Sequence, residues 1–261
     1  MSFPASLWLV GCGNMGGAML RRWIEAGLAP DAVTVIDPSP RDVPAGVTVV
    51  AKPPVTSPEV VVLAVKPQQL ESAATMLAGV EASLLVSILA GVDQATLAQH
   101  FPASNIVRAM PNLPVAIGKG VTALFGNADA RADALAAPLG LVEWIDDEKL
   151  FDAVTALSGC GPGFVFRFID ALAQAGAALG LSADQAARLA LATVEGSAAM
   201  AAGADADPAT LADRVASPGG STREGLNVLD ADASLVDLLK RTLTASARRN
   251  EEMGEAARAS A

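Results

Sequence analysis

The sequence has no tyrosine, one histidine and two cysteines among its 261 residues. Without tyrosine, dehydrogenase chemistry that depends on a tyrosine general acid is excluded. A single histidine excludes a metal site built from several imidazoles, and we expect no metal. Cys12 and Cys160 are too few for a disulfide framework, which favours a reducing, cytoplasmic location. Any chemistry must therefore use hydroxyls, carboxylates, lysine, backbone amides or a bound cofactor.

Positive charge is also scarce, since 18 Lys and Arg stand against 28 Asp and Glu. Nucleic acids and anionic membrane surfaces are bound by clustered basic side chains, so we expect neither as a partner. Although 52% of the residues are hydrophobic, no run approaches the roughly 18–20 apolar residues of a membrane-spanning helix. The apolar run at residues 7–10 is too short, and lacks the basic flank, for a signal peptide. The length favours two domains or one large α/β unit.

The first part of the chain alternates short apolar runs with helical patterns, which predicts a doubly wound, mostly parallel α/β sheet. Several of the runs are continuously apolar, as in strands buried on both faces. We expect strands at residues 6–10, 33–36, 47–50, 60–65, 84–89, 105–109, 121–125 and 141–145. We expect helices at residues 15–26, 68–77, 93–99 and 129–137.

The pattern changes near residue 150, after which only Ala- and Leu-rich segments at helical spacing remain. We expect helices at residues 164–179, 184–201, 208–215, 223–229 and 234–253. The prediction is a first domain at residues 1–155 and an all-α domain at residues 156–261. The later segments are apolar all round, so we expect self-association through them, as a dimer or larger.

A G-x-G-x-x-G motif follows the first expected strand and opens a helix. Gly11 permits a tight turn, Gly13 lets a pyrophosphate approach the backbone, and Gly16 lets helix and strand pack closely. The alternative is a glycine-rich turn without a ligand, but the position after a strand favours a dinucleotide site. The residues expected to contact the dinucleotide here are Val10, Gly11, Cys12, Gly13, Asn14, Met15 and Gly16.

Asp37 ends the second expected strand. An acidic residue at this place usually binds the adenosine ribose and repels a 2′-phosphate, which points to NADH. Ser39 and Arg41 follow closely, however, and can hold a phosphate if Asp37 turns away, so NADPH stays open. Asp37 can equally be only a turn-forming residue before Pro38.

Three more strand ends should border the same dinucleotide site, because ligands of open α/β sheets lie at the carboxyl ends of strands. Lys66 can serve the cofactor or be a solvated charge, and Asn112 can donate to a carboxamide or cap a turn. The residues at these strand ends are Ala64, Val65, Lys66 and Pro67, then Ala90 and Gly91, then Met110, Pro111 and Asn112.

Two glycine–proline loops lie in the helical half. The first, residues 158–163, can approach a ligand or simply link the domains. In the second, residues 217–224 (SPGGSTRE), Ser221 and Glu224 have the spacing of a capping box, so a helix should start there. Gly219 and Gly220 leave the helix amides open to a small carboxylate, unless the loop is only a helix cap. Thr222 should project its hydroxyl from the first turn.

Taken together, these residues resemble the pyrroline-5-carboxylate reductase family. The matching blocks occur in the family's order across nearly the whole chain, and the block at residues 215–222 is the most specific. The blocks are residues 11–16, 64–67, 107–112, 158–163 and 215–222.

The resemblance implies a Rossmann domain followed by an all-α dimerisation domain, with NAD(P)H-dependent reduction of 1-pyrroline-5-carboxylate to L-proline. It implies that Ser217, Gly219, Gly220, Ser221 and Thr222 hold the substrate, and that the hydroxyl of Thr222 bonds the ring nitrogen. The chain departs from the family in two ways. Phe164 stands where the family commonly has an aromatic hydroxyl. Around Ala51 the chain lacks the asparagine that the family resemblance leads us to expect near the adenosine ribose.

Two other readings stay open. A β-hydroxyacid dehydrogenase also joins a G-x-G-x-x-G domain to helices, but its chemistry needs a lysine on the long interdomain helix. The only basic residue of the expected helix at residues 164–179 is Arg167, and this helix has no lysine. A non-catalytic nucleotide-binding dimer would bind cofactor without turnover, and gives no reason for residues 217–222.

Overall fold

The structure is a computed structural model that describes residues 2–259, with side chains described as far as residue 255. Eight strands form one sheet in the order β3-β2-β1-β4-β5-β6-β7-β8. The strands are β1 (Leu7–Val10), β2 (Val33–Ile36), β3 (Thr48–Val50), β4 (Val60–Leu63), β5 (Leu84–Ser87), β6 (Ile106–Pro111), β7 (Gly120–Gly126) and β8 (Gly140–Trp144). The predicted doubly wound, mostly parallel sheet is confirmed.

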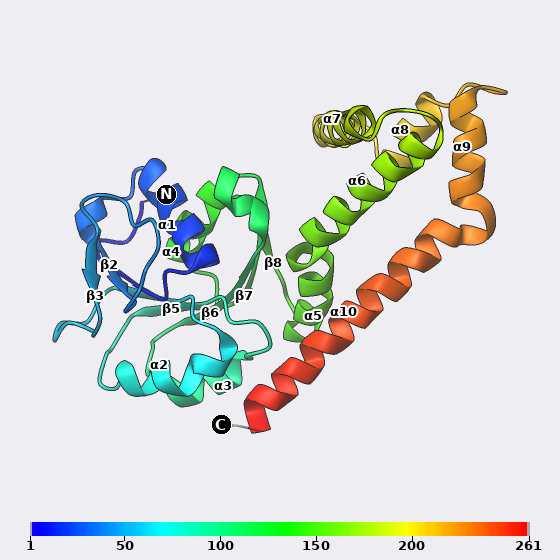
Figure 1. The fold of residues 1–261 in the computed structure, drawn as a ribbon. Helices are drawn as coiled ribbons and strands as arrows, with labels where there is room; N and C mark the ends of the chain where they lie inside the picture. Colours follow the sequence, from blue (N-terminus) through cyan, green and yellow to red (C-terminus); the bar gives the residue numbers. More distant parts are fainter. Residues whose placement is uncertain (1, 260–261) are drawn as a thin grey trace. The chain divides into compact units, whose positions relative to one another are not determined.

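Helices cover both faces of this sheet (Figure 1). Alternate residues of one strand therefore enter different cores: Leu7 and Leu9 pack in the cluster that contains Trp23, while Trp8 and Val10 face the other cluster. The helices are α1 (Asn14–Glu25) and α4 (Ala130–Ala136) on the first face, and α2 (Leu70–Met76) and α3 (Gln94–His100) on the second.

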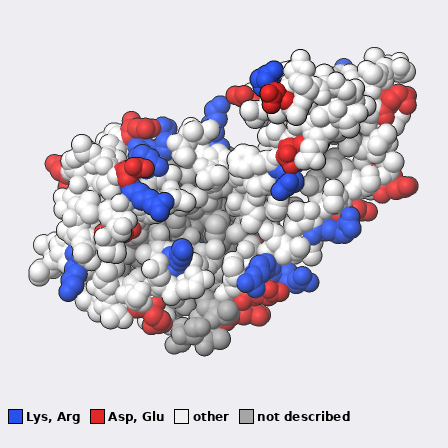
Figure 2. Space-filling view, viewed as in Figure 1, with Lys and Arg blue, Asp and Glu red and all other residues white. Residues whose placement is uncertain are grey.

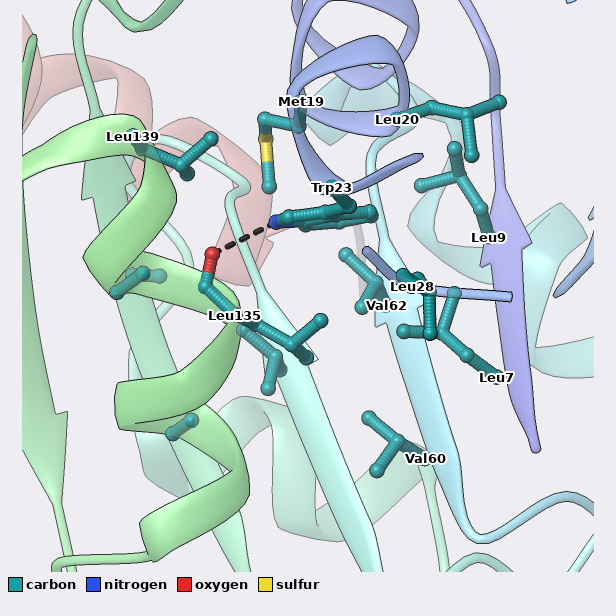
Figure 3. Packing of buried hydrophobic residues seen from close by; sticks show 14 of the residues in the cluster. Leu7, Leu9, Met19, Leu20, Trp23, Leu28, Val60, Val62, Leu135 and Leu139 are labelled. Atoms are coloured by element: carbon teal, nitrogen blue, oxygen red, sulfur yellow. Dashed lines mark hydrogen bonds between the residues drawn. The ribbon is translucent and has the colours of Figure 1, made fainter. Parts of the chain in front are cut away.

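Trp23 is the centre of the first core. Its side chain is fully buried among leucines and valines of α1, β1 and β4, and its indole nitrogen donates to the carbonyl of Leu135 in α4 at 2.6 Å (Figure 3). The bond satisfies the one polar atom of a large apolar side chain and ties α1 to α4 across the sheet face.

One strand pair breaks the parallel pattern. β7 runs antiparallel to β6, while β8 is again parallel to β7. Only residues 112–119 separate β6 from β7, which is shorter than the dozen or more residues of a parallel crossover. The reversal is completed at Gly118, whose φ of 68° suits glycine.

The chain divides into two compact units. One contains the residues up to Cys160 together with those from Ala245 onward, and the other is Gly161–Thr244. The division thus lies five residues beyond the expected 155/156 boundary, and the last part of the C-terminal helix belongs with the sheet. A short helix, α5 (Phe151–Val154), and a π-helical turn at Thr155–Gly159 precede the division.

The second unit is helical throughout, and side chains cap two of its helices. Ser182 accepts from the amide of Gln185, and Asp207 from that of Thr210, with Pro208 in the first turn. The helices are α6 (Gly161–Ala178), α7 (Ala183–Ala202), α8 (Pro208–Arg214), α9 (Ser221–Asp230) and the first part of α10 (Ser234–Ala259). Among the described residues, no helix is long and apolar enough to cross a membrane.

Short single-turn helices complete the secondary structure. They are Pro30–Ala32, Pro67–Gln69, Leu113–Ile117, Ala137–Leu139, Glu148–Leu150 and Ala231–Ala233.

Candidate functional site

The glycine motif forms a tight turn between β1 and α1. Gly11 has a φ of 91°, and a Cβ at this position would lie 2.7 Å from the carbonyl oxygen of Ala64. A Cβ on Gly16 would collide with the carbonyl oxygen of Gly11. Both positions therefore require glycine, because any side chain would separate helix, turn and strand.

Gly13 has a different role in the same turn. A Cβ there would meet nothing within 4 Å, so the backbone faces open space. Gly13 is also the N-cap of α1, and no side chain caps the helix. The first amides of α1 are thus directed at an open, glycine-lined approach, which fits the pyrophosphate of a dinucleotide.

A cavity of about 380 Å³ adjoins this turn. Seven of the residues expected to bind cofactor line it: Val10, Gly11, Gly13, Asp37, Ala64, Val65 and Lys66. The cavity lies at the carboxyl ends of β1, β2 and β4. Here β1 leads to β2 on one side and β4 to β5 on the other, so this is the switch point of the sheet.

The rest of the lining was not among the residues expected to bind the cofactor. One face of α2 contributes side chains at helical spacing, and the ends of β2 and β3 add the others. These residues are Gln69, Ser72, Ala73 and Met76 from the α2 side, and Ile36, Pro38 and Ala51 from the strands. The periodicity of residues 68–77 could have indicated this face, but not which way it points.

Asp37 is half-buried and uses both carboxylate oxygens. Oδ2 accepts from the amide of Cys12 at 2.7 Å, and Oδ1 accepts from the amide of Ser39 at 2.8 Å. Asp37 is therefore a turn-forming residue that also lines the cavity. Each carboxylate oxygen has a second lone pair, so both can still accept from a ribose hydroxyl.

Cys12 lies behind the turn and is fully buried. Burial raises the pKa of its thiol, and the neighbouring carboxylate of Asp37 raises it further. The thiol is thus held in its protonated, unreactive form. Its backbone amide, rather than its sulfur, takes part in the site through Asp37.

Asn112 is also engaged within the protein. Its Nδ2 donates to the carbonyl of Ser158 at 3.0 Å, and its Oδ1 accepts from the amide of Val121 at 2.8 Å. The side chain thus ties the end of β6 and the start of β7 to the π-helical turn. Of the other expected cofactor residues, Asn14, Met15, Gly16, Ser39, Pro67, Ala90, Gly91, Met110 and Pro111 do not line the 380 Å³ cavity.

The loop at residues 217–222 belongs to the helical unit. The predicted capping box is wrong, because α9 begins one residue earlier than that motif requires. Gly220 is the N-cap, no side chain caps the helix, and Ser221 is the first helical residue. The helix amides at this end are consequently not used by any capping side chain.

Glycine is required on the approach to α9. Gly219 has a φ of 70°, and the amide of Gly220 donates to the carbonyl of Ser217 at 2.9 Å. A Cβ on Gly220 would lie 2.6 Å from the hydroxyl oxygen of Ser217. Arg223 forms an ion pair with Asp213 of α8 at 2.7 Å, which fixes the first turn of α9. Ser221 and Thr222 are exposed in this structure.

Both parts of the chain are similar to known proteins. A pyrroline-5-carboxylate reductase from Synechocystis is 36% identical, over 95% of this chain and 98% of the relative. This chain belongs to the pyrroline-5-carboxylate reductase family. Residues 148–253 match the model for pyrroline-5-carboxylate reductase dimerisation, and residues 6–91 match the model for NADP oxidoreductase, coenzyme F420-dependent.

Solved structures of the family have the same fold. A pyrroline-5-carboxylate reductase from Coxiella burnetii superposes with a TM-score of 0.84 at 31% identity, covering 95% of this chain and 98% of the other. The Plasmodium falciparum pyrroline carboxylate reductase, solved with NADP bound, gives 0.79 at 27% identity, covering 97% and 100%. The predicted Rossmann domain followed by an all-α dimerisation domain is thus confirmed.

Proposed function

We propose that this chain reduces 1-pyrroline-5-carboxylate to L-proline with NADPH or NADH. The observation that carries the proposal is the start of α9, where no side chain caps the helix amides and a Cβ on Gly219 would meet nothing within 4 Å, which leaves an approach for a small carboxylate. Two further observations support the proposal. The chain belongs to the reductase family, and the unit that contains the sheet (the sheet unit) has a glycine turn suited to a dinucleotide.

The cofactor site belongs to the sheet unit. The amides at Gly13 and the start of α1 would hold the pyrophosphate, and Asp37 would accept from the adenosine ribose. The strand ends that follow β4, β5 and β6 would border the nicotinamide half. We assign this half to Ala64, Val65, Lys66 and Pro67, to Ala90 and Gly91, and to Met110, Pro111 and Asn112.

The substrate site belongs to the helical unit, at Ser217, Gly219, Gly220, Ser221 and Thr222. The amides of the first turn of α9 would hold the carboxylate of the substrate, and the Thr222 hydroxyl would bond the ring nitrogen. A bound nicotinamide would supply the hydride for the imine carbon of the substrate, with the electrons of the C=N double bond passing to its nitrogen. A protonated imine is already electrophilic, so the protein must orient and desolvate it rather than supply a strong acid.

We propose that the helical unit also joins two or more copies, since its family model describes dimerisation. The cytoplasm is the proposed location, supported by two free cysteines, Cys12 and Cys160. The excess of acidic residues supports a small-molecule substrate rather than nucleic acid or a membrane surface.

The test is NAD(P)H oxidation with 1-pyrroline-5-carboxylate, run beside the oxidation of a small 3-hydroxy acid. Turnover of the imine alone supports the proposal. Turnover of the hydroxy acid would favour a β-hydroxyacid dehydrogenase, although α6 contains no lysine. Cofactor binding with neither reaction would leave a nucleotide-binding dimer.

Thr222→Val tests the substrate site, because valine keeps the shape of threonine and removes its hydroxyl. We expect kcat/KM for the imine to fall about 10- to 100-fold while the affinity for NAD(P)H is unchanged. Thr193→Val, an exposed threonine of α7, is the matched control. Unchanged kcat/KM in Thr222→Val would remove this hydroxyl from the mechanism.

A further inference from the structure

The last turns of α10 lie directly against the loop that follows β5. Gly91 has a φ of 75°, and a Cβ on it would lie 3.0 Å from the amide nitrogen of Gly254. A Cβ on Gly254 would lie 2.8 Å from the carbonyl oxygen of Gly91. Two backbones therefore touch here only because neither residue has a side chain, and neither backbone is a flexible group that could move aside.

A second contact joins the same helix to the π-helical turn. The hydroxyl of Ser246 donates to the sulfur of Cys160 at 3.2 Å. Asn250 lies one turn after Ser246 and one turn before Gly254, and only 6% of it is exposed. Residues four apart share one helix face, and along this face of α10 Ser246 is half-buried while Asn250 and Gly254 are buried. All of these residues belong to the sheet unit.

The two segments that α10 contacts have a common place in the sheet. Residues 90–91 follow β5, and the π-helical turn packs on the end of β6, since a Cβ on Gly159 would lie 3.8 Å from the sulfur of Met110. The strands β5 and β6 follow β4 in the sheet. They continue the carboxyl edge beyond the glycine turn and its cavity, where the nicotinamide half of a dinucleotide extends.

We propose that the last turns of α10 are a positioning element for the nicotinamide ring, acting through the Gly91–Gly254 backbone contact. The inference rests on the proposed cofactor site. Gly254 sets the position of the loop at residues 90–91, and this loop sets the position of the ring. Gly254 does not itself touch the cofactor, and the adenosine half is held elsewhere, at Gly13 and Asp37.

Gly254→Ala tests this arrangement, because the added methyl must displace the loop or the helix. We expect kcat for the imine to fall about 10-fold or more, since small misplacement of reacting groups is costly. The affinity for NADH, measured by titration, should stay within about threefold of wild type, because the adenosine contacts are intact. The emission spectrum of bound NADH should change, because the surroundings of its reduced ring change.

Met253→Ala is the second variant, in case the first does not fold. Met253 is half-buried, and its carbonyl carbon lies 3.4 Å from a Cβ built on Gly91. This variant keeps the backbone atoms of the contact and removes only the half-buried side chain next to Gly254, so we expect the same changes in kcat and spectrum, to a smaller degree. Glu251→Gln, exposed on the same turn, is the control and should behave as wild type.

Two results would overturn the inference. In one, both variants keep the wild-type kcat and the wild-type spectrum of bound NADH. In the other, kcat, NADH affinity and melting temperature fall together, which would make the contact structural only. If the wild-type protein does not reduce the imine, the proposed function fails on its own, while the spectra of bound NADH still test the position of the ring.

Discussion

Asp37 is the residue that bears most directly on the choice between NADH and NADPH. Its carboxylate accepts from the amides of Cys12 and Ser39 and lines the cavity. These bonds hold a negative charge at the end of β2, where a 2′-phosphate would be repelled and a ribose hydroxyl would be accepted. The two amides thus hold the carboxylate in the position that the proposed contact with the ribose requires.

Asp37→Ser should shift preference toward NADPH. The substitution removes the charge, keeps one hydroxyl acceptor for the neighbouring amides, and leaves Ser39 and Arg41 available to a phosphate. We expect the ratio of kcat/KM for NADPH to that for NADH to rise about 10-fold or more, as for loss of one close like-charge contact. Asp31→Ser, an exposed carboxylate before β2, is the control. An unchanged ratio would show that Asp37 is only a turn residue.

The start of α4 carries a network of charged side chains. Asp129 accepts from the amide and the Nε of Arg131, both at 2.9 Å, and pairs with its Nη2 at 2.7 Å. The hydrogen bond from the Arg131 side chain is the main reason that the pKa of Asp129 falls to about 2. A lowered pKa in the folded state stabilises the fold above the unfolded pKa of about 4 and loses that effect as pH falls toward 2.

Asp129→Asn tests this pH dependence. At pH 7 we expect the melting temperature to drop by about 2–4 °C, a modest change because the carboxylate is partly exposed to water. As the pH falls from 4 toward 2, the difference between variant and wild type should shrink. Thermal melts at several pH values measure it, with Glu81→Gln as an exposed control. A difference that persists at pH 2 would assign the effect to packing or to the amide cap.

Local patterns were enough to locate most elements but not their mutual arrangement. The expected strand at residues 33–36 coincides with β2, and the others agree within two residues. The antiparallel pairing of β6 and β7 was not predicted, although the expected strands at residues 105–109 and 121–125 already left only residues 110–120 to connect them. The helix α5 and the π-helical turn were missed because a tertiary contact stabilises them: Phe151 is buried in a cluster with Met110 and Ala123, which no local pattern indicates.

The candidate site, too, could be predicted from the sequence only in part. The glycine turn could be predicted because its geometry accepts only glycine at positions 11 and 16, and these glycines are visible in the sequence. The lining from α2 could not, since the direction of a short helix face depends on packing. The contact between Gly91 and Gly254 joins residues far apart in the chain, and no local pattern indicates it.

At the scale of the whole molecule, the helical unit has a surface unlike that of the sheet unit. Its exposed large apolar side chains include Val165, Phe166, Phe168, Leu172, Leu179, Leu189, Leu191, Met200, Val228 and Val236. Figure 2 shows charged side chains in small separate groups, with uncharged surface between them. Apolar surface of this extent is rare on a monomer, and the matching family model describes dimerisation. The unit therefore stabilises its helices by association rather than by an internal core alone.

Phe166→Asp should weaken this association without unfolding the chain. Phe166 is 56% exposed in one copy, so the substitution costs little there, whereas burying an unpaired carboxylate between copies is unfavourable. We expect the dissociation constant of the assembly to rise at least about 30-fold, as for loss of a central aromatic anchor. Sedimentation across a range of concentrations measures it, and Asn227→Asp places the same charge at an exposed polar position as control. An unchanged mass at every concentration would place the interface on another face of the helices.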